Sequence, residues 1–377
     1  MPEIFIGPRV RKSPFYEATV RWGARAFTVY NHMYMPTAFT SPEDEYERLL
    51  SAVTLWDVAC ERQVAITGPD AARFVQYLTP RNLASCEAGQ CRYIVLTDAK
   101  GGIINDAVLL RLAANEYWIS PGDGDALLWA QGIATRSDMD VRVFEPDVSP
   151  LQLQGPKAPQ VARKLFDESV SELAYYRLAR TSLNGIPLVV SRTGWSGELG
   201  YEIYLCDGTR GNELWETIMA AGADDGIAPA APSTIRSIEG GILSYCSDIT
   251  RDDNPFVLGM ERLVDVDMQA DFIGKEALRR IRQEGVARRL VGFVADVAKP
   301  LPGNSEFWPV LRDGEVVGHV TRATWSPQLS QYIGFANVPA ECAAPGNRFN
   351  VESEHGSFDV SVVNTPFVAA KKVIEKA

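Results

Sequence analysis

The chain has 377 residues, 46% of them hydrophobic and 23% charged, with a formal net charge of −11. This length exceeds what one compact core usually holds, and the composition is typical of a folded protein of two or three domains rather than a disordered one. The negative charge and the scattered basic residues argue against binding to nucleic acid or to an anionic membrane, because both depend on clustered Lys and Arg.

No targeting or cross-linking signal stands out. Residues 1–11 lack the charged-then-apolar order of a secretory signal, and no apolar run reaches membrane-spanning length. We therefore expect a cytoplasmic protein. The six cysteines include no CxxC pair, which argues against a disulfide framework. The three histidines have no helical spacing from one another, so the sequence predicts no metal site.

The first half of the chain alternates predicted helices and strands. A charged helix is expected from about Pro42, with apolar returns at Leu49, Leu50 and Val53, and it closes at 55–59. The elements expected next are a strand at 62–68, a helix capped by Asp70 that runs through Leu78, a hairpin of 90–97 and 103–112, a strand at 116–120 and a helix at 124–133.

A similar order recurs before the pattern changes. The elements expected are a strand at 148–154, a helix at 158–166, strands at 186–192 and 200–205, and a helix at 211–221. Two α+β domains of related build are the simplest interpretation. From Ala287 onward, short strands separated by Pro and Gly are typical of a small all-β domain. These strands are expected at 290–294, 315–321, 331–336, 348–351 and 358–363.

Three segments carry the strongest functional signal: Gly101-Gly-Ile-Ile-Asn-Asp106, the glycine-punctuated run from Arg192 to Leu205, and Asp271-Phe-Ile-Gly-Lys-Glu-Ala-Leu278. In this order and at these spacings they resemble the tetrahydrofolate-dependent aminomethyltransferase family, which comprises the glycine cleavage T protein and its demethylase relatives. The resemblance covers nearly the whole chain.

The resemblance implies a fold and domain boundaries. The fold class is α+β, with two related ferredoxin-like α/β domains and a small C-terminal β-barrel or jelly-roll domain in a cloverleaf arrangement. The implied domains are a discontinuous folate-binding domain of residues 1–52 and 145–265, a second α+β domain of residues 53–144, and a barrel domain of residues 280–377.

The resemblance also implies a site for the pterin ring. Glu202 matches the family's acid that pairs with pterin N–H groups, because a carboxylate accepts two hydrogen bonds side by side. Without the motif, an exposed strand glutamate would be the plainer interpretation. Asp106 matches the family's aspartate near N5 and is the expected catalytic residue, although Asx residues also satisfy turn amides. Asn105 replaces the first acid of the usual pair.

Aromatic side chains are expected to line the slot and to face a cationic substrate, since cation–π attraction supplies roughly 0.5–2 kcal/mol per ring. Any one of them alone is more typical of a core or half-buried strand aromatic. The expected cofactor contacts, besides Glu202, are Trp195, Trp118, Tyr93 and Tyr204. The expected substrate contacts are Tyr30, Tyr176 and Trp195.

The implied function is methyl transfer from a small sulfonium or ammonium compound to tetrahydrofolate as the methyl acceptor, giving 5-methyltetrahydrofolate. Such a reaction depends on the alignment of the two reactants and on the desolvation of the cation. The leaving group requires no proton donor. The loss of an acid at Asn105 agrees with this chemistry. Segments 26–33, 56–64 and 243–251 resemble dimethylsulfoniopropionate demethylases more than T proteins.

Three other relatives of this family suggest alternative functions. A glycine cleavage aminomethyltransferase would produce methylene-tetrahydrofolate and would use a lipoyl carrier protein as partner. The iron–sulfur-assembly relatives carry a cysteine signature that is missing from 269–276. Flavin-linked oxidases need a GxGxxG segment that this chain lacks. The sequence leaves open whether the protein forms a homodimer.

One departure concerns the tail of the folate. Ser233 stands where T proteins carry an arginine that contacts this tail. Arg236, three residues on, is either its replacement or a surface helix residue.

Overall fold

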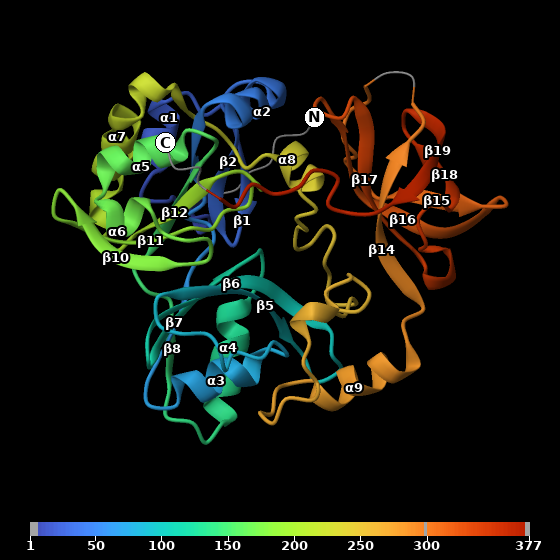
Figure 1. The fold of residues 1–377 in the computed structure, drawn as a ribbon, viewed down its shortest axis with the longest axis horizontal. Coiled ribbons are helices and arrows are strands. Elements are labelled where there is room, and N and C mark those ends of the chain that lie inside the picture. The colour runs from blue at the N-terminus through green and yellow to red at the C-terminus, as the bar shows by residue number, and fades with distance from the viewer. Residues whose placement is uncertain (1–6, 298–299, 374–377) are drawn as a thin grey trace.

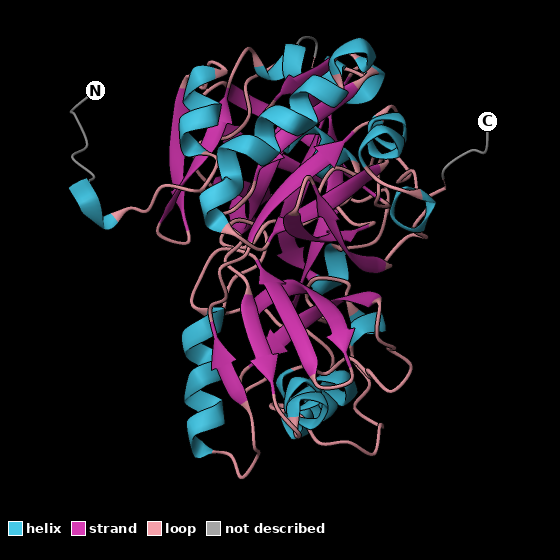
Figure 2. Cartoon of the chain, turned by 90° about the vertical axis from the view of Figure 1, so that its left-hand side faces the viewer, coloured by secondary structure: helices cyan, strands magenta, loops and turns pink. Residues whose placement is uncertain are grey.

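Three sheets organise residues 7–297 and 300–373, which this computed structural model describes (Figure 1). The six-stranded sheet and the five-stranded sheet form two lobes, and a closed barrel forms the third. A view turned by 90° shows the first two lobes stacked one above the other (Figure 2). The predicted class, α+β with a C-terminal β-barrel, is confirmed.

The six-stranded sheet is antiparallel except for one parallel pair, β3 with β13. Its strand order is β10 (Leu178–Leu183), β11 (Ile186–Ser191), β12 (Gly200–Leu205), β9 (Ser149–Gln154), β3 (Val53–Asp57) and β13 (Ile227–Pro229). The helices whose buried residues share its core are α1 (Tyr16–Arg21), α5 (Ala158–Leu165), α6 (Glu168–Ser171) and α7 (Gly211–Ala221). The strands predicted at 148–154, 186–192 and 200–205 are therefore confirmed.

The segment around residue 53 differs from its prediction. Helix α2 (Pro42–Ser51) is capped at its N-terminus by Ser41, whose hydroxyl accepts a hydrogen bond from the Asp44 amide at 3.0 Å. Its C-cap residue is Ala52, which has a non-helical backbone. The expected helical return at Val53 is wrong, because β-branched Val53 and Thr54 favour a strand and both faces of β3 are buried. Strand β3 pairs with β9 in the six-stranded sheet. It therefore lies in the first lobe, although the domain boundary expected at residue 52 would assign it to the second domain.

The five-stranded sheet is antiparallel throughout. Its order is β5 (Gln90–Thr97), β6 (Ile103–Ala113), β7 (Glu116–Pro121), β4 (Val64–Thr67) and β8 (Arg142–Phe144), and its helices are α3 (Ala71–Leu78) and α4 (Ala126–Arg136). The predicted hairpin, strands and helices of this region are confirmed. Asp70 precedes α3 but does not cap it, because its carboxylate accepts the Asp140 amide at 2.8 Å instead.

The two sheets pack against each other through a shared apolar core. Side chains alternate along a strand, so β12 directs Tyr201 and Ile203 toward its helices and Glu202 and Tyr204 toward the other sheet. This interdomain core contains Ala65, Cys91, Leu110, Leu112, Trp118, Val148, Leu178, Val189 and Tyr204. Polar side chains on these inner faces are therefore buried between two domains.

The C-terminal lobe is a closed antiparallel barrel, which leaves no exposed edge strand. Its order is β14 (Arg288–Ala295), β17 (Gln331–Pro339), β16 (Glu315–Ser326), β15 (Trp308–Arg312), β18 (Arg348–Ser353) and β19 (Gly356–Val363). Trp308, Tyr332 and Phe358 fill its interior, with the Trp308 and Tyr332 rings stacked at 6.3 Å. The all-β prediction for this region is confirmed.

The remaining elements are a two-stranded hairpin and further helices. They are the hairpin β1 (Ala26–Tyr30) and β2 (Met33–Ala38), the helices α8 (Thr234–Glu239) and α9 (Lys275–Glu284), and the short 3-10 helices η1 (Gly7–Arg9), η2 (Gly208–Arg210), η3 (Ala223–Asp225), η4 (Glu261–Leu263) and η5 (Ala340–Cys342). Between α8 and α9, residues 240–274 form a long irregular segment in the middle of the molecule (Figure 1). Within 7–297 and 300–373, no helix combines the length and apolar character needed to cross a membrane.

A buried ion pair joins the barrel to this central segment. The Arg322 Nε on β16 donates to Asp248 Oδ2 at 2.6 Å, and the other guanidinium nitrogens donate to Ser237 Oγ and the Ile242 carbonyl. Both charged side chains are at most 10% exposed. Removing one partner would leave the other charge buried without compensation, which is costly.

Replacing Arg322 with Ala should lower the free energy of unfolding by about 3–5 kcal/mol, because Asp248 would stay buried without its counter-charge. Urea denaturation measures this loss. The matched control is Arg348→Ala, which removes a barrel arginine whose pair with Asp359 is solvent-exposed and should cost about 0–1 kcal/mol. Equal losses in the two variants would contradict the prediction.

Candidate functional site

Three carboxylates, of Glu61, Asp106 and Glu202, gather between the two sheets. Glu202 lies on β12 and Asp106 on β6, each on the face that its sheet turns toward the other, and Glu61 lies in the turn between β3 and β4. Burial is the largest cause of the raised pKa of Glu61, and the nearby charges of Glu202 and Asp106 raise this pKa further. This gathering of acids is the candidate site.

Neighbouring strands hold Glu202 in place. Gln152 stands opposite it on β9 and Ser191 opposite it on β11, so the register of the sheet supplies two of its partners. Its Oε1 accepts from Gln152 Nε2 at 2.9 Å, and its Oε2 accepts from the hydroxyls of Thr193, Tyr204 and Ser191. Burial raises the pKa of Glu202, while these hydrogen bonds oppose the shift.

The hydrogen bonds of Glu202 limit what a ligand can add. Each carboxylate oxygen accepts about two hydrogen bonds, and Oε2 already receives at least that number from protein hydroxyls. Room for a further donor is left on Oε1. The side-by-side pairing predicted from the sequence uses both oxygens, so the structure supports one ligand hydrogen bond to Glu202 more readily than two.

Within residues 7–297 and 300–373, Asp106 keeps one oxygen free of protein partners. Its Oδ2 accepts from the Tyr93 hydroxyl at 2.8 Å, whereas its Oδ1 is buried without a hydrogen-bond partner in these ranges. Burial raises the pKa of Asp106 from 3.8 to about 6, against the lowering effect of the Tyr93 hydrogen bond. Because a buried carboxylate oxygen without a donor is costly, Oδ1 is a natural acceptor for a ligand N–H group.

Asn105 has a structural role beside Asp106. It is fully buried, its Oδ1 accepts the Gly122 amide at 2.9 Å, and its Nδ2 donates to the Asp123 carbonyl at 2.8 Å. A carboxylate could not make the second bond, because it has no proton to donate. The Asx interpretation therefore applies to Asn105, which fixes the turn at Gly122.

Gly122 brings Asp106 and Tyr30 close together. A Cβ at residue 122 would lie 3.3 Å from Asp106 Oδ1, 3.5 Å from the Tyr30 hydroxyl and 3.0 Å from the Cβ of Tyr245. A side chain here would fill the space between these groups. The absence of one places the predicted substrate contact Tyr30 beside the predicted catalytic residue.

Tyr176, another predicted substrate contact, lies near Glu202. Its backbone is left-handed, with a φ of 61°, which is uncommon for a bulky residue and marks local strain. The Tyr176 carbonyl accepts a hydrogen bond from the Cys91 amide at 2.9 Å, and the Tyr176 amide donates to the Arg192 carbonyl at 3.0 Å. The Tyr176 backbone therefore bridges the two sheets. Burial raises the pKa of Tyr176, and the charge of Glu202 adds to this effect.

Two of the expected cofactor contacts belong to the interdomain core. Trp118 is 6% exposed and Tyr204 is fully buried, and their rings lie 6.1 Å apart. The Tyr204 hydroxyl donates to Glu202 at 2.7 Å. Their burial does not support direct contact with a cofactor. Instead, the Tyr204 hydroxyl holds Glu202, and the Trp118 ring packs against Tyr204.

Trp195 connects Glu202 to the barrel. Its amide donates to Gln152 Oε1 at 3.2 Å, and Gln152 in turn donates to Glu202. Its ring is partly exposed, and the guanidinium carbon of Arg322 lies 5.8 Å from the ring centroid. The ring therefore already has one cation beside it, supplied by the barrel.

Arg236 is not a surface residue. It is fully buried on α8, where its Nε donates to Glu198 Oε1 at 3.1 Å and Glu239 lies 3.5 Å from its Nη1. The surface-helix interpretation is wrong, because Arg236 is fully buried. Its Nη1 and Nη2 have no hydrogen-bond partner within the described residues, and its replacement of the folate-tail arginine stays a prediction.

Sequence reasoning missed Glu61, Gln152 and Tyr245. Gln152 faces Glu202 only through strand register, and the Tyr245 hydroxyl reaches the Ile104 carbonyl from the central segment. The available signal for Glu61 was a charged residue in the short turn between two buried strands, since such turns position side chains at sheet ends.

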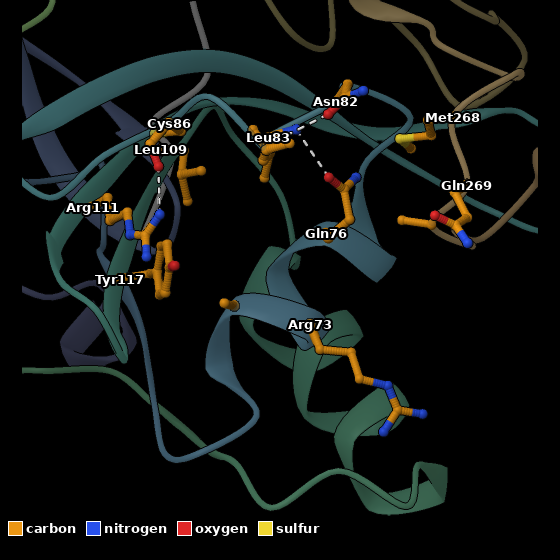
Figure 3. Close-up of a pocket in the computed structure, with 13 residues that line it drawn as sticks. Arg73, Gln76, Asn82, Leu83, Cys86, Leu109, Arg111, Tyr117, Met268 and Gln269 are labelled. Atoms are coloured by element: carbon orange, nitrogen blue, oxygen red, sulfur yellow. Dashed lines mark hydrogen bonds between the residues drawn. The ribbon is translucent and has the colours of Figure 1, made fainter.

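A separate cavity of about 490 Å³ lies on the helix-covered face of the five-stranded sheet (Figure 3). Its polar groups mostly bond to the protein itself: Gln76 Oε1 accepts the Leu83 amide, and Arg111 donates to the Cys86 carbonyl. It shares no lining residue with the three carboxylates. Within the described ranges, no group of three potential ligands is arranged to hold a metal ion.

Comparisons with known proteins match both the N-terminal part and the C-terminal barrel of the chain. Residues 15–268 match the family model described as the GCVT N-terminal domain, and residues 288–369 match the glycine cleavage T-protein C-terminal barrel domain. The chain is 39% identical over 362 residues to dimethylsulfoniopropionate demethylase DmdA of Ruegeria pomeroyi, covering 96% of this chain and 98% of that protein.

Two aminomethyltransferases are also similar. The chain is 32% identical over 348 residues to the aminomethyltransferase of Clostridium botulinum, covering 89% of this chain and 92% of that protein. The crystal structure of the glycine cleavage system aminomethyltransferase T from Bartonella henselae matches with a TM-score of 0.86 at 23% identity, over 96% of this chain and 99% of that one. This match shows the same fold.

The raised pKa of Asp106 predicts a pH dependence of stability. Between its ordinary value of 3.8 and its folded value of about 6, the folded protein keeps a proton that the unfolded chain has lost. The contribution of this group to the free energy of unfolding therefore falls by about 3 kcal/mol as the pH rises through this window, and it stays lowered above it.

Asp106→Asn removes this dependence, so the variant should gain up to about 3 kcal/mol relative to wild type between pH 4 and pH 7. Urea unfolding at a series of pH values measures the difference. Asp313→Asn, at a carboxylate whose side chain is 95% exposed, controls for the loss of one charge. Parallel curves for wild type and Asp106→Asn would contradict the prediction.

Proposed function

This chain belongs to the glycine cleavage T-protein family of one-carbon transferases, and on that premise we propose that it moves a methyl group from a small cationic donor to tetrahydrofolate. The products are 5-methyltetrahydrofolate and the demethylated donor. The donor is a sulfonium or quaternary ammonium compound. Dimethylsulfoniopropionate is the first candidate, because the chain is 39% identical to a demethylase of that compound.

The free oxygen of Asp106 is the observation that carries this proposal. A buried acceptor without a donor fits a ligand rich in N–H groups, and the pterin ring is such a ligand. Glu202 Oε1 offers a second acceptor from the opposite sheet. Two acceptors on facing sheets would fix the ring's orientation by hydrogen bonds from two directions.

The reaction requires the protein to position the two reactants and to accept one proton. When bound, tetrahydrofolate supplies N5, whose lone pair forms the new bond to the methyl carbon. The sulfur or nitrogen of the donor keeps the electron pair of the broken bond and leaves without net charge, so it needs no proton. Asp106, with a pKa of about 6, is mostly ionised at neutral pH and accepts the proton that N5 loses.

Asn105 favours a cationic donor over an aminomethyl donor. An aminomethyl leaving group requires a proton from the enzyme, and the residue beside Asp106 is an amide committed to Gly122 and Asp123. The alternative is a glycine cleavage aminomethyltransferase that acts with a lipoyl carrier protein and gives methylene-tetrahydrofolate. The similarity to the Clostridium botulinum aminomethyltransferase supports that alternative.

The deciding experiment incubates the purified protein and tetrahydrofolate with dimethylsulfoniopropionate, glycine betaine, dimethylglycine, sarcosine and methoxylated aromatics in turn, and follows the folate products by mass spectrometry. Formation of 5-methyltetrahydrofolate with a sulfonium or quaternary ammonium compound would support the proposal. Methylene-tetrahydrofolate formed only with an aminomethylated lipoyl carrier would establish the alternative. Transfer from uncharged donors alone would contradict a cationic donor.

Replacing Glu202 with Gln should weaken tetrahydrofolate binding by about 1.5–3 kcal/mol, or about ten- to a hundredfold, because a charged acceptor becomes a neutral one in a buried site. Anaerobic calorimetry measures this affinity. Glu116→Gln removes a carboxylate on β7 that pairs with Arg180 outside the site, and it should bind as wild type does. An unchanged affinity in Glu202→Gln would remove Glu202 from the folate site.

A further inference from the structure

Glu61 occupies the site without a role in the chemistry above. It lies between β3 and β4, where its amide donates to the Val58 carbonyl at 2.9 Å, and its side chain is partly exposed. Its Oε2 accepts from the Ser120 hydroxyl at 3.2 Å. Its Oε1 has no hydrogen-bond partner in the described ranges and is not sealed from solvent.

A short chain of hydrogen bonds fixes Glu61 as an acceptor. The buried amide of Gln63 can only donate through its nitrogen, and it donates to Ser120 Oγ at 2.8 Å. Ser120 must then use its single proton toward Glu61. The side chain of Glu61 is therefore held with one oxygen tied to the five-stranded sheet and the other directed away from that bond.

Ser120 ties Glu61 to the face of the five-stranded sheet that carries Asp106. Ser120 pairs with Val108, two residues from Asp106 on the same face of β6, and Trp118 lies two residues before Ser120 on that face of β7. The Trp118 ring packs on Tyr204, whose hydroxyl donates to Glu202. Glu61 and Glu202 are thus held on the facing sides of the two sheets, and the charge of Glu202 raises the pKa of Glu61 after the larger effect of burial.

The three acids of the site lack an ion-pair partner in the part of the chain that the structure describes. Among the ion pairs of residues 7–297 and 300–373, none involves Glu61, Asp106 or Glu202. Arg322, the barrel arginine beside the Trp195 ring, is already paired with Asp248. Grouped carboxylates without a counter-charge repel one another, and a bound cation would relieve this repulsion.

We infer that Glu61 recognises the positive charge of the methyl donor, with its free Oε1 facing the onium centre across the gap from Glu202. This inference rests on the proposed function, because it assigns a residue to the donor at the same site. It names Glu61 as the residue that selects cationic over neutral compounds. Tyr30 borders the same site, since a Cβ at Gly122 would lie 3.5 Å from its hydroxyl and 3.3 Å from Asp106 Oδ1.

Calorimetry with tetramethylammonium and trimethylsulfonium tests the inference without requiring turnover. Tert-butanol, an uncharged compound of similar shape, serves as the neutral probe. We expect wild type to bind both cations more tightly than tert-butanol, and we expect Glu61→Gln to weaken cation binding at least about tenfold. Its affinity for tetrahydrofolate should stay unchanged, which also shows that the variant is folded.

Two further variants complete the design. Glu61→Asp keeps the charge on a shorter side chain, so it should retain part of the preference for cations even if Glu61→Gln fails to fold. Glu116→Gln removes one carboxylate elsewhere on the same sheet and should bind both cations as wild type does.

Two results would overturn the inference: unchanged cation affinity in the folded Glu61→Gln variant, or wild-type binding of tetramethylammonium no tighter than that of tert-butanol. Cation binding that depends on Glu61, in a protein that methylates no folate with any donor, would refute the proposed function while leaving the recognition of cations by Glu61 in place.

Discussion

The gathering of three carboxylates between two sheets, with Glu202 buried and Glu61 and Asp106 partly exposed, is the constraint on which this structure depends. Charged groups in a low-dielectric environment are stable only with hydrogen bonds or counter-charges. Within the described residues, Glu202 has four protein donors, Asp106 has one, and Glu61 has one. The protein's own donors are therefore concentrated on Glu202, and Asp106 and Glu61 each keep an oxygen without a protein donor.

The rest of the fold serves this arrangement. The apolar interdomain core sets the distance between the sheets, and Trp118 and Tyr204 within it hold Glu202 from the side away from the gap. The barrel contributes Arg322, which pairs with Asp248 and lies beside the Trp195 ring. The barrel therefore stabilises the central segment and one border of the site, while its own core stays separate.

The position of each acid has a chemical meaning. At Asn105 an amide replaces an acid because the turn at Gly122 needs both a donor and an acceptor. At Glu61 a carboxylate is present with one oxygen free. A site arranged in this way loses a proton donor beside Asp106 and gains negative charge elsewhere. In the proposed reaction, this exchange would suit a donor that arrives with positive charge, since its leaving group needs no proton.

The sequence alone determined the features that depend on neighbours along the chain. Alternation and turn residues predicted the hairpin of β5 and β6 and the strands of the barrel, and the motif residues located Glu202 and Asp106. The tertiary structure decided the pairing of β3 with β9, the burial of Trp118, Tyr204 and Arg236, and the position of Glu61. These features depend on packing between segments far apart in the chain, such as Glu61 with Ser120, 59 residues away, and no local pattern encodes such contacts.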